Sequence, residues 1–256
     1  MRIVIIGSGN VATHLAKAFA KENEVLQIYS KSIANAQLLA NAIDGARATD
    51  NIKELVPNAD LYVISVKDDA IETIVNNVTF DSGLWVHTSG SVTIDILKTK
   101  FGRCGVLYPL QTFSRDMDIA ISNVPFFIEG CDNITHQEIE KIAQTISNNT
   151  HAANSVQRKQ LHIAAVFGCN FVNHMWAIAD EILVKAGYSF DILTPLIEAT
   201  LNKATIISPQ KGQTGPARRG DMAIINSHQQ MLPLNHAYLY HTISNSIISK
   251  YINNNE

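Results

Sequence analysis

Three small residues near the start of the chain have the spacing of a nucleotide-binding turn. The apolar run Arg2–Ile6 leads into Gly7-Ser8-Gly9-Asn10-Val11-Ala12, and an apolar-periodic helix follows. The first glycine permits a tight turn, the second lets a pyrophosphate approach the backbone, and the alanine allows close packing of helix on strand. The helix N-terminus offers free N–H groups to the phosphates. In this order the pattern G-x-G-x-x-A predicts a dinucleotide site.

The end of the second predicted strand indicates which dinucleotide binds. NAD enzymes usually carry a carboxylate about 20 residues after the glycines, where it binds the ribose hydroxyls. This chain instead has Tyr29-Ser30-Lys31-Ser32. Two hydroxyls and an ammonium suit a 2′-phosphate, which a carboxylate would repel. The sequence therefore predicts NADP, with Ser30, Lys31 and Ser32 near the 2′-phosphate.

A long apolar helix in the second half of the chain carries side chains that suit acid–base chemistry. At about 100° per residue, Lys159, Asn170 and Asn173 fall within an arc of about 100° from His162. Reduction of a carbonyl needs a proton donor and a group that holds the developing oxyanion. We expect His162 or Lys159 to donate the proton, and Asn170 or Asn173 to orient the substrate. The alternative is a partly solvated helix face.

Polar residues also follow three other predicted strands, at the edge where ligands of a doubly wound sheet lie. Val66 and Lys67 follow one strand, His87-Thr88-Ser89 the next, and Gln111 a third. We expect Ser89 and Gln111 to contact substrate, while His87 has the alternative of a satisfied histidine at a strand end. The predicted cofactor contacts are Gly7, Ser8, Gly9, Asn10, Val11, Ser30, Lys31, Ser32, Val66, Lys67, His87 and Thr88.

A glycine-rich loop at 211–221 contains two adjacent arginines. An arginine fork suits a substrate carboxylate, so Thr214 and Arg218 are predicted substrate contacts. Asp221 has the alternative of capping the helix that follows.

Two different patterns divide the chain. Strand-like and helix-like stretches alternate over the first part, which predicts a mostly parallel, doubly wound α/β sheet. Helical patterns dominate from about 156 to the end. We therefore expect a Rossmann domain over 1–154 and an all-α domain over 155–256. Strands are predicted at 25–29, 60–66, 84–87, 105–108 and 125–128, and helices at 34–42, 135–147, 158–186, 190–207, 221–231 and 235–251, with a frayed tail at 253–255.

The composition narrows the class of protein. A net charge of −3 without a basic run argues against nucleic-acid binding. The three scattered cysteines form no C-x-x-C pair, so neither a metal site nor redox chemistry is expected. We find no signal peptide and no stretch of about 18 consecutive apolar residues, and we expect a cytoplasmic protein without membrane contact.

Six segments in order resemble the Rossmann-like proteins fused to domain of unknown function 2520, which are related to deazaflavin-dependent NADP oxidoreductases. They are GSGNVATHLA, YSKS, HTSG, YPLQTF, HIAAVFGCNF and TGPARRGD, beginning at residues 7, 29, 87, 108, 162 and 214. The family usually has histidine where this chain has Tyr108, and proline where it has Lys67. The resemblance implies an architecture like that of the 6-phosphogluconate dehydrogenase superfamily, whose helical domain commonly forms a dimer.

The residues and the resemblance together predict an NADPH-dependent oxidoreductase that reduces a small 2-oxo acid, with ketopantoate as the best substrate guess. One alternative is hydride exchange between NADP and a deazaflavin coenzyme. A second is a non-catalytic NADPH sensor or assembly module. We expect a homodimer, because the helices after Ser155 carry much apolar surface for a half-sized domain.

Overall fold

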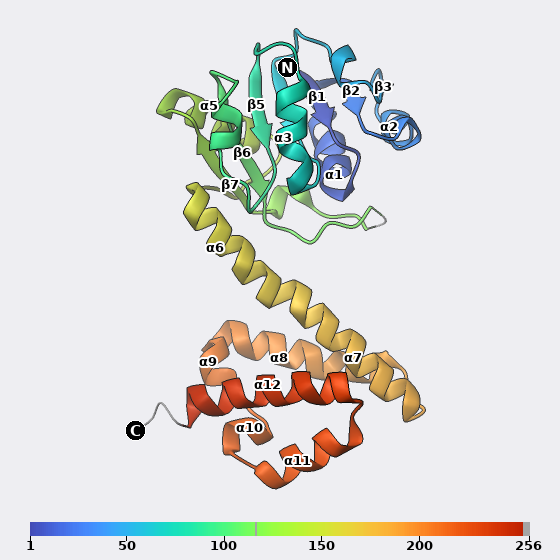
Figure 1. Cartoon of the computed structure of the whole chain (residues 1–256), viewed down its shortest axis with the longest axis vertical. Coiled ribbons are helices and arrows are strands. Elements are labelled where there is room, and N and C mark those ends of the chain that lie inside the picture. Colours follow the sequence, from blue (N-terminus) through green and yellow to red (C-terminus); the bar gives the residue numbers. More distant parts are fainter. Residues whose placement is uncertain (116, 253–256) are drawn as a thin grey trace. The chain divides into compact units, whose positions relative to one another are not determined.

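The computed structural model of the chain describes residues 1–115 and 117–252 (Figure 1). The tail predicted at 253–255 lies outside these residues. By its contacts the chain divides into an N-terminal unit, Met1–Asn170, and a C-terminal unit, Phe171–Glu256. The first helical segment after residue 154 thus belongs to the N-terminal unit by contact. The functional boundary expected at 154/155 stays a prediction.

An eight-stranded sheet forms the centre of the N-terminal unit. Its strands, in chain order, are β1 (Arg2–Ile6), β2 (Glu24–Tyr29), β3 (Arg47–Thr49), β4 (Leu61–Ile64), β5 (Leu84–His87), β6 (Cys104–Pro109), β7 (Phe126–Gly130) and β8 (Thr150–Ala152). They lie in the order β3-β2-β1-β4-β5-β6-β7-β8. All neighbours are parallel except β6 and β7, which pair antiparallel. The predicted mostly parallel, doubly wound sheet is confirmed, and its switch point lies between β1 and β4.

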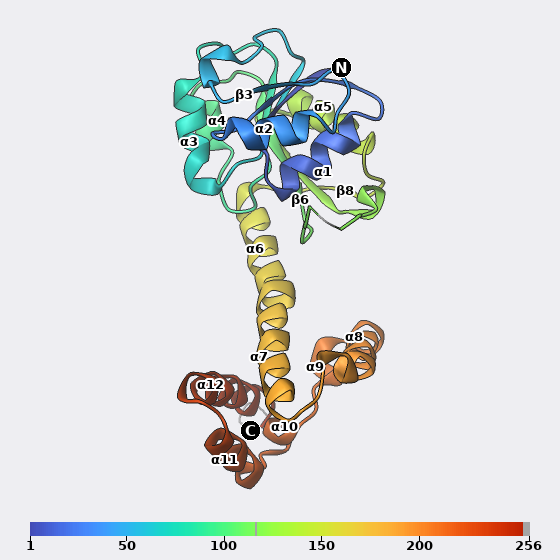
Figure 2. The ribbon, with the colours of Figure 1, turned by 90° about the vertical axis from the view of Figure 1, so that its right-hand side faces the viewer.

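Helices cover both faces of this sheet (Figures 1 and 2). They are α1 (Asn10–Phe19), α2 (Ile33–Ala40), α3 (Asp68–Asn77), α4 (Asp95–Lys98) and α5 (Asn133–Gln144). Ile3 and Ile5 of β1 belong to one buried cluster with α1, α2 and α5, while Val4 and Ile6 belong to another with α3 and α4. Because successive strand residues face opposite ways, the unbroken apolar run RIVII fits a strand buried on both faces.

Three aromatic rings form a stack in the second of these clusters. Trp85 of β5 is fully buried, with its ring centroid 4.1 Å from that of Tyr62 and 4.1 Å from that of Phe101. The ring planes differ by only 7° and 6°. The indole N–H donates to the Ser82 carbonyl at 2.9 Å, so the polar atom of this large side chain is satisfied.

Most predicted elements are present, with ends that differ by a few residues. The strand predicted at 84–87 matches β5, and the helix predicted at 135–147 is found as α5. The elements for which no range was predicted include β3, α3, α4 and β8. Three of these have only three or four residues, which is too short for a periodic pattern to show. The loop predicted at 211–221 instead contains a short helix at Pro216–Arg219 and the end of another at Pro209–Gly212.

One continuous helix begins at Ser155 and ends at Lys185. It consists of α6 (Ser155–Ala165), a π-helical turn over Val166–Asn170 and α7 (Phe171–Lys185). A capping box starts it, because Asn154 accepts from the Gln157 N–H and the Gln157 side chain accepts from the Asn154 N–H. By length and composition alone, Ser155–Lys185 is the one helix among the described residues that could cross a membrane, which is weak evidence for doing so.

The C-terminal unit is helical and has little core of its own. Its further helices are α8 (Thr194–Ile207), α9 (Pro209–Gly212), α10 (Pro216–Arg219), α11 (Met222–Met231) and α12 (Leu234–Tyr251). Among its described residues only two apolar side chains, Ala217 and Ile225, are buried. A cavity of about 250 Å³ lies between residues of α7, α10 and α12. The predicted all-α second part of the chain is therefore confirmed.

Candidate active site

A cavity of about 1290 Å³ opens at the carboxyl ends of the central strands. Its lining comes from the loops after β1, β2, β4, β5 and β6, and from α6 and the π-helical turn. All of these residues belong to the N-terminal unit. This is where ligands of a doubly wound sheet bind, and the volume exceeds that of an ordinary small-molecule pocket.

The glycine-rich turn after β1 forms one end of the cavity, which we call the phosphate end (Gly7, Ser8, Gly9, Ser30 and Lys31). Gly7 has φ +130°, and a Cβ there would lie 2.0 Å from the Ser65 carbonyl oxygen, so only glycine fits against β4. At Gly9 a Cβ would meet nothing within 4 Å. The turn thus touches the protein on one side and leaves open space on the other, which fits a pyrophosphate.

The groups around this open space suit an anion. Gly9 is the N-cap of α1 and provides no side chain to cap it, so the first turn faces the cavity with its N–H groups and positive dipole end. The Ser8 hydroxyl donates to the Ser30 hydroxyl at 2.8 Å, which ties the turn to the end of β2. Lys31 lines the cavity beside Ser30. These residues fit a dinucleotide with a 2′-phosphate.

A segment after β6 also lies against the glycine-rich turn, and this contact was not predicted from the sequence. The Arg115 guanidinium donates to the Ser8 carbonyl. The Asn10 side chain donates to the Phe113 carbonyl at 2.8 Å, and His14 Nε2 lies 2.8 Å from the Ser114 carbonyl. Arg115 and Phe113 both line the cavity. Arg115 therefore adds a cation to the phosphate end, from a residue more than 100 positions away.

Two side chains meet at the other end of the cavity, which we call the acid–base end (Tyr108, His162 and the turn that contains Ser89). The Tyr108 hydroxyl of β6 lies 3.1 Å from Nδ1 of His162 on α6, within hydrogen-bonding distance. Both residues line the cavity. Burial raises the pKa of Tyr108 to about 12, with the charge of Arg158 acting against it. Tyr108 therefore stays protonated at neutral pH.

Hydroxyls complete the acid–base end. The Thr88 hydroxyl donates to the Ser65 hydroxyl at 3.2 Å, and both residues line the cavity at the ends of β5 and β4. Ser89 is buried, and its hydroxyl oxygen accepts from the N–H groups of Ser91 and Val92. The arrangement can transfer a proton through the pair formed by Tyr108 and His162, with hydroxyls beside it.

The structure corrects the expectation for His87. Its side chain is fully buried and does not line the cavity. Nδ1 accepts from the Ser89 N–H at 3.2 Å, while Nε2 is the one buried side-chain nitrogen or oxygen without a hydrogen bond among the described residues. Burial, together with the nearby Arg158 charge, lowers the pKa of His87 to about 3. His87 is a neutral residue behind the site.

Two further predicted contacts lie outside the cavity lining. Lys159 is exposed and is not among the α6 residues that line the cavity, which are Leu161, His162, Ala164 and Ala165. Beyond residue 165 the π-helical turn also departs from the rotation of about 100° per residue that an α-helix has, so angular positions counted from His162 no longer hold. Ser32 caps α2, where its hydroxyl accepts from the Asn35 N–H. Neither residue lines the cavity, and their contact with cofactor or substrate stays a prediction.

The other predicted site residues are found in one unit or the other. Those that line the cavity are Gly7, Ser8, Gly9, Asn10, Val11, Ser30, Lys31, Val66, Lys67, Thr88, Ser89, Gln111, His162 and Asn170. Asn173, Thr214 and Arg218 lie in the C-terminal unit. There Arg218 packs over the Tyr251 ring at 5.1 Å, and Asp221 caps α11 by accepting from the Ile224 N–H. Substrate contact by these three residues stays a prediction.

Two family models match the chain. Residues 2–98 match the model described as NADP oxidoreductase coenzyme F420-dependent, and residues 124–247 match domain of unknown function 2520. No curated protein matches. Among the described residues, no group of three His, Cys, Asp or Glu side chains is placed to hold a metal ion.

Three solved structures are similar over nearly the whole chain. BF3122 from Bacteroides fragilis, provisionally assigned as an NADP oxidoreductase, is 39% identical with a TM-score of 0.90, covering 97% of this chain and 98% of that one. TM1727 from Thermotoga maritima is 21% identical, with a TM-score of 0.77 and coverage of 96% and 97%. A reductive aminase from Aspergillus terreus, in complex with NADPH and ethyl levulinate, is 17% identical, with a TM-score of 0.70 and coverage of 96% and 94%. The last two share the fold alone.

Proposed function

The chain belongs to the family of NADP oxidoreductases that combine a Rossmann domain with domain of unknown function 2520, and on this premise we propose that it reduces a small 2-oxo acid with NADPH. The observation that carries the proposal is the contact between Tyr108 and His162 in the same cavity as the glycine-rich turn. One end holds the cofactor and the other can deliver a proton.

Bound NADPH supplies a hydride, and this chain's residues supply position and protons. The phosphate end binds the pyrophosphate through backbone N–H groups, and Ser30 and Lys31 bind the 2′-phosphate. His162 donates a proton to the substrate oxygen, and Tyr108 fixes the orientation of the imidazole. Asn170 and Ser89 hold the substrate. Lys67 gives the cavity a cation that suits an anionic substrate.

The same proposal includes a second copy of the chain. In the C-terminal unit, Leu196 and Leu201 of α8 are each 63% exposed and Ile206 is 80% exposed. Phe171 and Trp176 of α7 are exposed as well. A helix with so much open apolar surface needs a cover, and a homodimer through the C-terminal helices provides one without membrane contact. A single-chain mass in solution, measured by light scattering, would refute the dimer.

The test of function is oxidation of NADPH by the purified protein with a panel of 2-oxo acids, ketopantoate included, and NADH in parallel. We expect turnover of at least one acid and preference for NADPH. Turnover with a deazaflavin coenzyme alone would favour hydride exchange, which rests on a family match confined to residues 2–98. Tight NADPH binding without turnover of any compound would favour the sensor.

A further inference from the structure

The turn Ser89–Val92 after β5 packs directly against the two side chains of the acid–base end. A Cβ at Gly90 would lie 2.8 Å from Cζ of Tyr108 and 3.0 Å from Cβ of His162. The Gly90 backbone is therefore in contact with both rings. A displacement of the turn therefore acts on these rings directly, because no side chain lies between Gly90 and either ring.

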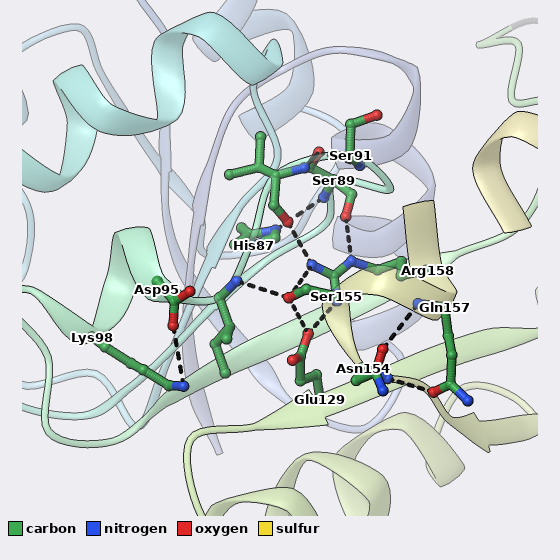
Figure 3. A network of polar contacts seen from close by, with 12 residues as sticks. His87, Ser89, Ser91, Asp95, Lys98, Glu129, Asn154, Ser155, Gln157 and Arg158 are labelled. Atoms are coloured by element: carbon green, nitrogen blue, oxygen red, sulfur yellow. Dashed lines mark hydrogen bonds and ion pairs between the residues drawn. The ribbon is translucent and has the colours of Figure 1, made fainter. Parts of the chain in front are cut away.

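One buried side chain fixes this turn at two points (Figure 3). Arg158 of α6 has no exposed surface, and its Nε donates to the Ser89 carbonyl at 3.1 Å. One terminal nitrogen donates to the Val92 carbonyl and to the Ser155 hydroxyl, the latter at 3.3 Å. The first and last residues of the turn are thus held by a single planar group.

The charge of Arg158 is paired with a carboxylate from another strand. Its second terminal nitrogen donates to Oε2 of Glu129 on β7, whose side chain is 16% exposed. The Ser155 hydroxyl donates to the same carboxylate at 2.8 Å and accepts from the Ile94 N–H at 3.3 Å. A buried charge is tolerated only when it is paired and hydrogen-bonded, and here every terminal nitrogen has a partner.

Arg158 and His162 are four residues apart on α6, so they lie on the same face of the helix one turn apart. The anchor that holds the turn therefore also sets where His162 stands above it. The same network joins α6, β7 and the turn after β5.

We propose that Arg158, paired with Glu129, is a positioning residue that sets the geometry of Tyr108 and His162 through the Ser89–Val92 turn. It acts through these residues and lies outside the cavity lining. The effect on turnover rests on the proposed function, but the effect on the His162 ring does not. A guanidinium is needed because a lysine ammonium lacks the planar fork that reaches all of these acceptors at once.

The test compares Arg158→Lys and Glu129→Gln with the wild-type chain. Arg103→Met is the matched control, since it removes an ion pair with Glu138 in which the side chains are 53% and 38% exposed. We expect Arg158→Lys to lower kcat about tenfold to 100-fold, as displacements of about 1 Å do, while the Kd for NADPH stays within twofold. The His162 ring signals, assigned by NMR with His162→Gln, should shift in Arg158→Lys and Glu129→Gln but not in Arg103→Met.

Each result bears on the proposal. Wild-type kcat and unshifted His162 signals in a folded Arg158→Lys protein would overturn it. A parallel loss of kcat and NADPH affinity would also overturn it, because general destabilisation affects both ends of the cavity. If Arg158→Lys does not fold, Glu129→Gln decides, since it keeps the size of the side chain. If the wild-type chain turns over no substrate, the proposed function fails, and the His162 signals still decide about positioning.

Discussion

The two ends of the cavity are built in different ways. The phosphate end consists of a few adjacent residues whose backbone faces open space, with Ser30 hydrogen-bonded to Ser8. The acid–base end brings Tyr108 from β6 and His162 from α6 together, 54 residues apart in sequence. Binding a phosphate needs backbone N–H groups, which every residue except proline has, whereas proton transfer needs particular side chains at a fixed distance.

This difference has a consequence for how each end tolerates change. The phosphate end depends on the absence of side chains, so it fails when one is added. The acid–base end depends on a buried network behind it, so it fails when a partner is removed. Substitutions should therefore separate cofactor affinity from turnover, and the following predictions test that separation.

The largest effect is expected at Gly7, where fold and binding coincide. In Gly7→Ala the new Cβ would lie 2.0 Å from the Ser65 carbonyl oxygen at a φ of +130°. We expect a loss of more than about 4 kcal/mol in the free energy of unfolding, or no folded protein. Gly9→Ala is the control, because its Cβ meets nothing within 4 Å. It should unfold at the wild-type temperature yet bind NADPH at least about tenfold more weakly by calorimetry. Equal stability of the two variants would contradict the difference between these glycines.

The second effect concerns the buried histidine behind the acid–base end. His87 has its pKa lowered to about 3 in the folded chain and has about 6.5 when unfolded. The unfolded state therefore binds more protons below pH 6.5, and stability present above that pH is lost as the pH falls toward 3. At about 1.4 kcal/mol per pKa unit the full loss approaches about 5 kcal/mol.

Urea unfolding at pH 7 and pH 4 measures this loss. In His87→Asn the amide oxygen can still accept from the Ser89 N–H, but nothing titrates, so the dependence on pH should flatten. His151→Asn, at an exposed position, should leave the wild-type slope unchanged. An unaltered slope in His87→Asn would show that another group is responsible.

The third effect separates the two ends most directly. Tyr108→Phe and His162→Gln each remove one partner of the hydrogen bond at the acid–base end. We expect kcat to fall about 100-fold or more in His162→Gln and less in Tyr108→Phe, with the Kd for NADPH within threefold of wild type. Steady-state kinetics and calorimetry measure the two quantities. If affinity falls as far as kcat, the two ends are not independent.

A smaller effect, on NADPH affinity and not on kcat, is expected from Arg115→Met at the phosphate end. Removal of its guanidinium from the Ser8 carbonyl should raise the Kd for NADPH about tenfold and weaken the dependence of Kd on salt. The kcat at saturating NADPH should not change. Arg103→Met serves again as the control. A lower kcat with an unchanged Kd for NADPH would contradict the prediction, because it would show that Arg115 acts at the acid–base end.

The smallest effect tests the choice between NADP and NAD. Ser30→Asp brings a carboxylate to the end of β2, where it would repel a 2′-phosphate and accept from ribose hydroxyls. The ratio of kcat/KM for NADPH to that for NADH should fall about fivefold or more. An unchanged ratio would show that Ser30 and Lys31 do not read the 2′-phosphate.

Sequence patterns were sufficient where structure depends on neighbours along the chain. The run RIVII, the glycine spacing and the helix that follows predicted β1, the turn and α1, because each is a local signal. No range was predicted for α3, although Ile71, Ile74 and Val75 have helical spacing, a signal that was available. The short strands β3 and β8 are held by their neighbours in the sheet, and a three-residue strand has no period of its own.

The acid–base end was only half predictable. His162 was identified from its helix, but the helical rule assigned Lys159 to the same face and passed over Arg158. Rotation of a helix about its axis is set by what it packs against, here the turn after β5. The π-helical turn changed the angular positions of the residues that follow it a second time, and no residue type in the sequence indicates such a turn. Arg115 was not predicted, because its contact with Ser8 joins residues 107 positions apart and leaves no local pattern in the sequence.

The buried stack of Trp85 has a practical consequence for spectroscopy. The chain has two tryptophans, and they lie in different units. Trp85 is sealed between two rings in the N-terminal unit, whereas Trp176 on α7 is 39% exposed. Their fluorescence should therefore differ in wavelength and in quenching by iodide. With Trp176 replaced by phenylalanine, the remaining emission reports on the sheet alone, and with Trp85 replaced it reports on α7. The thermal unfolding of each unit can then be followed separately by tryptophan fluorescence.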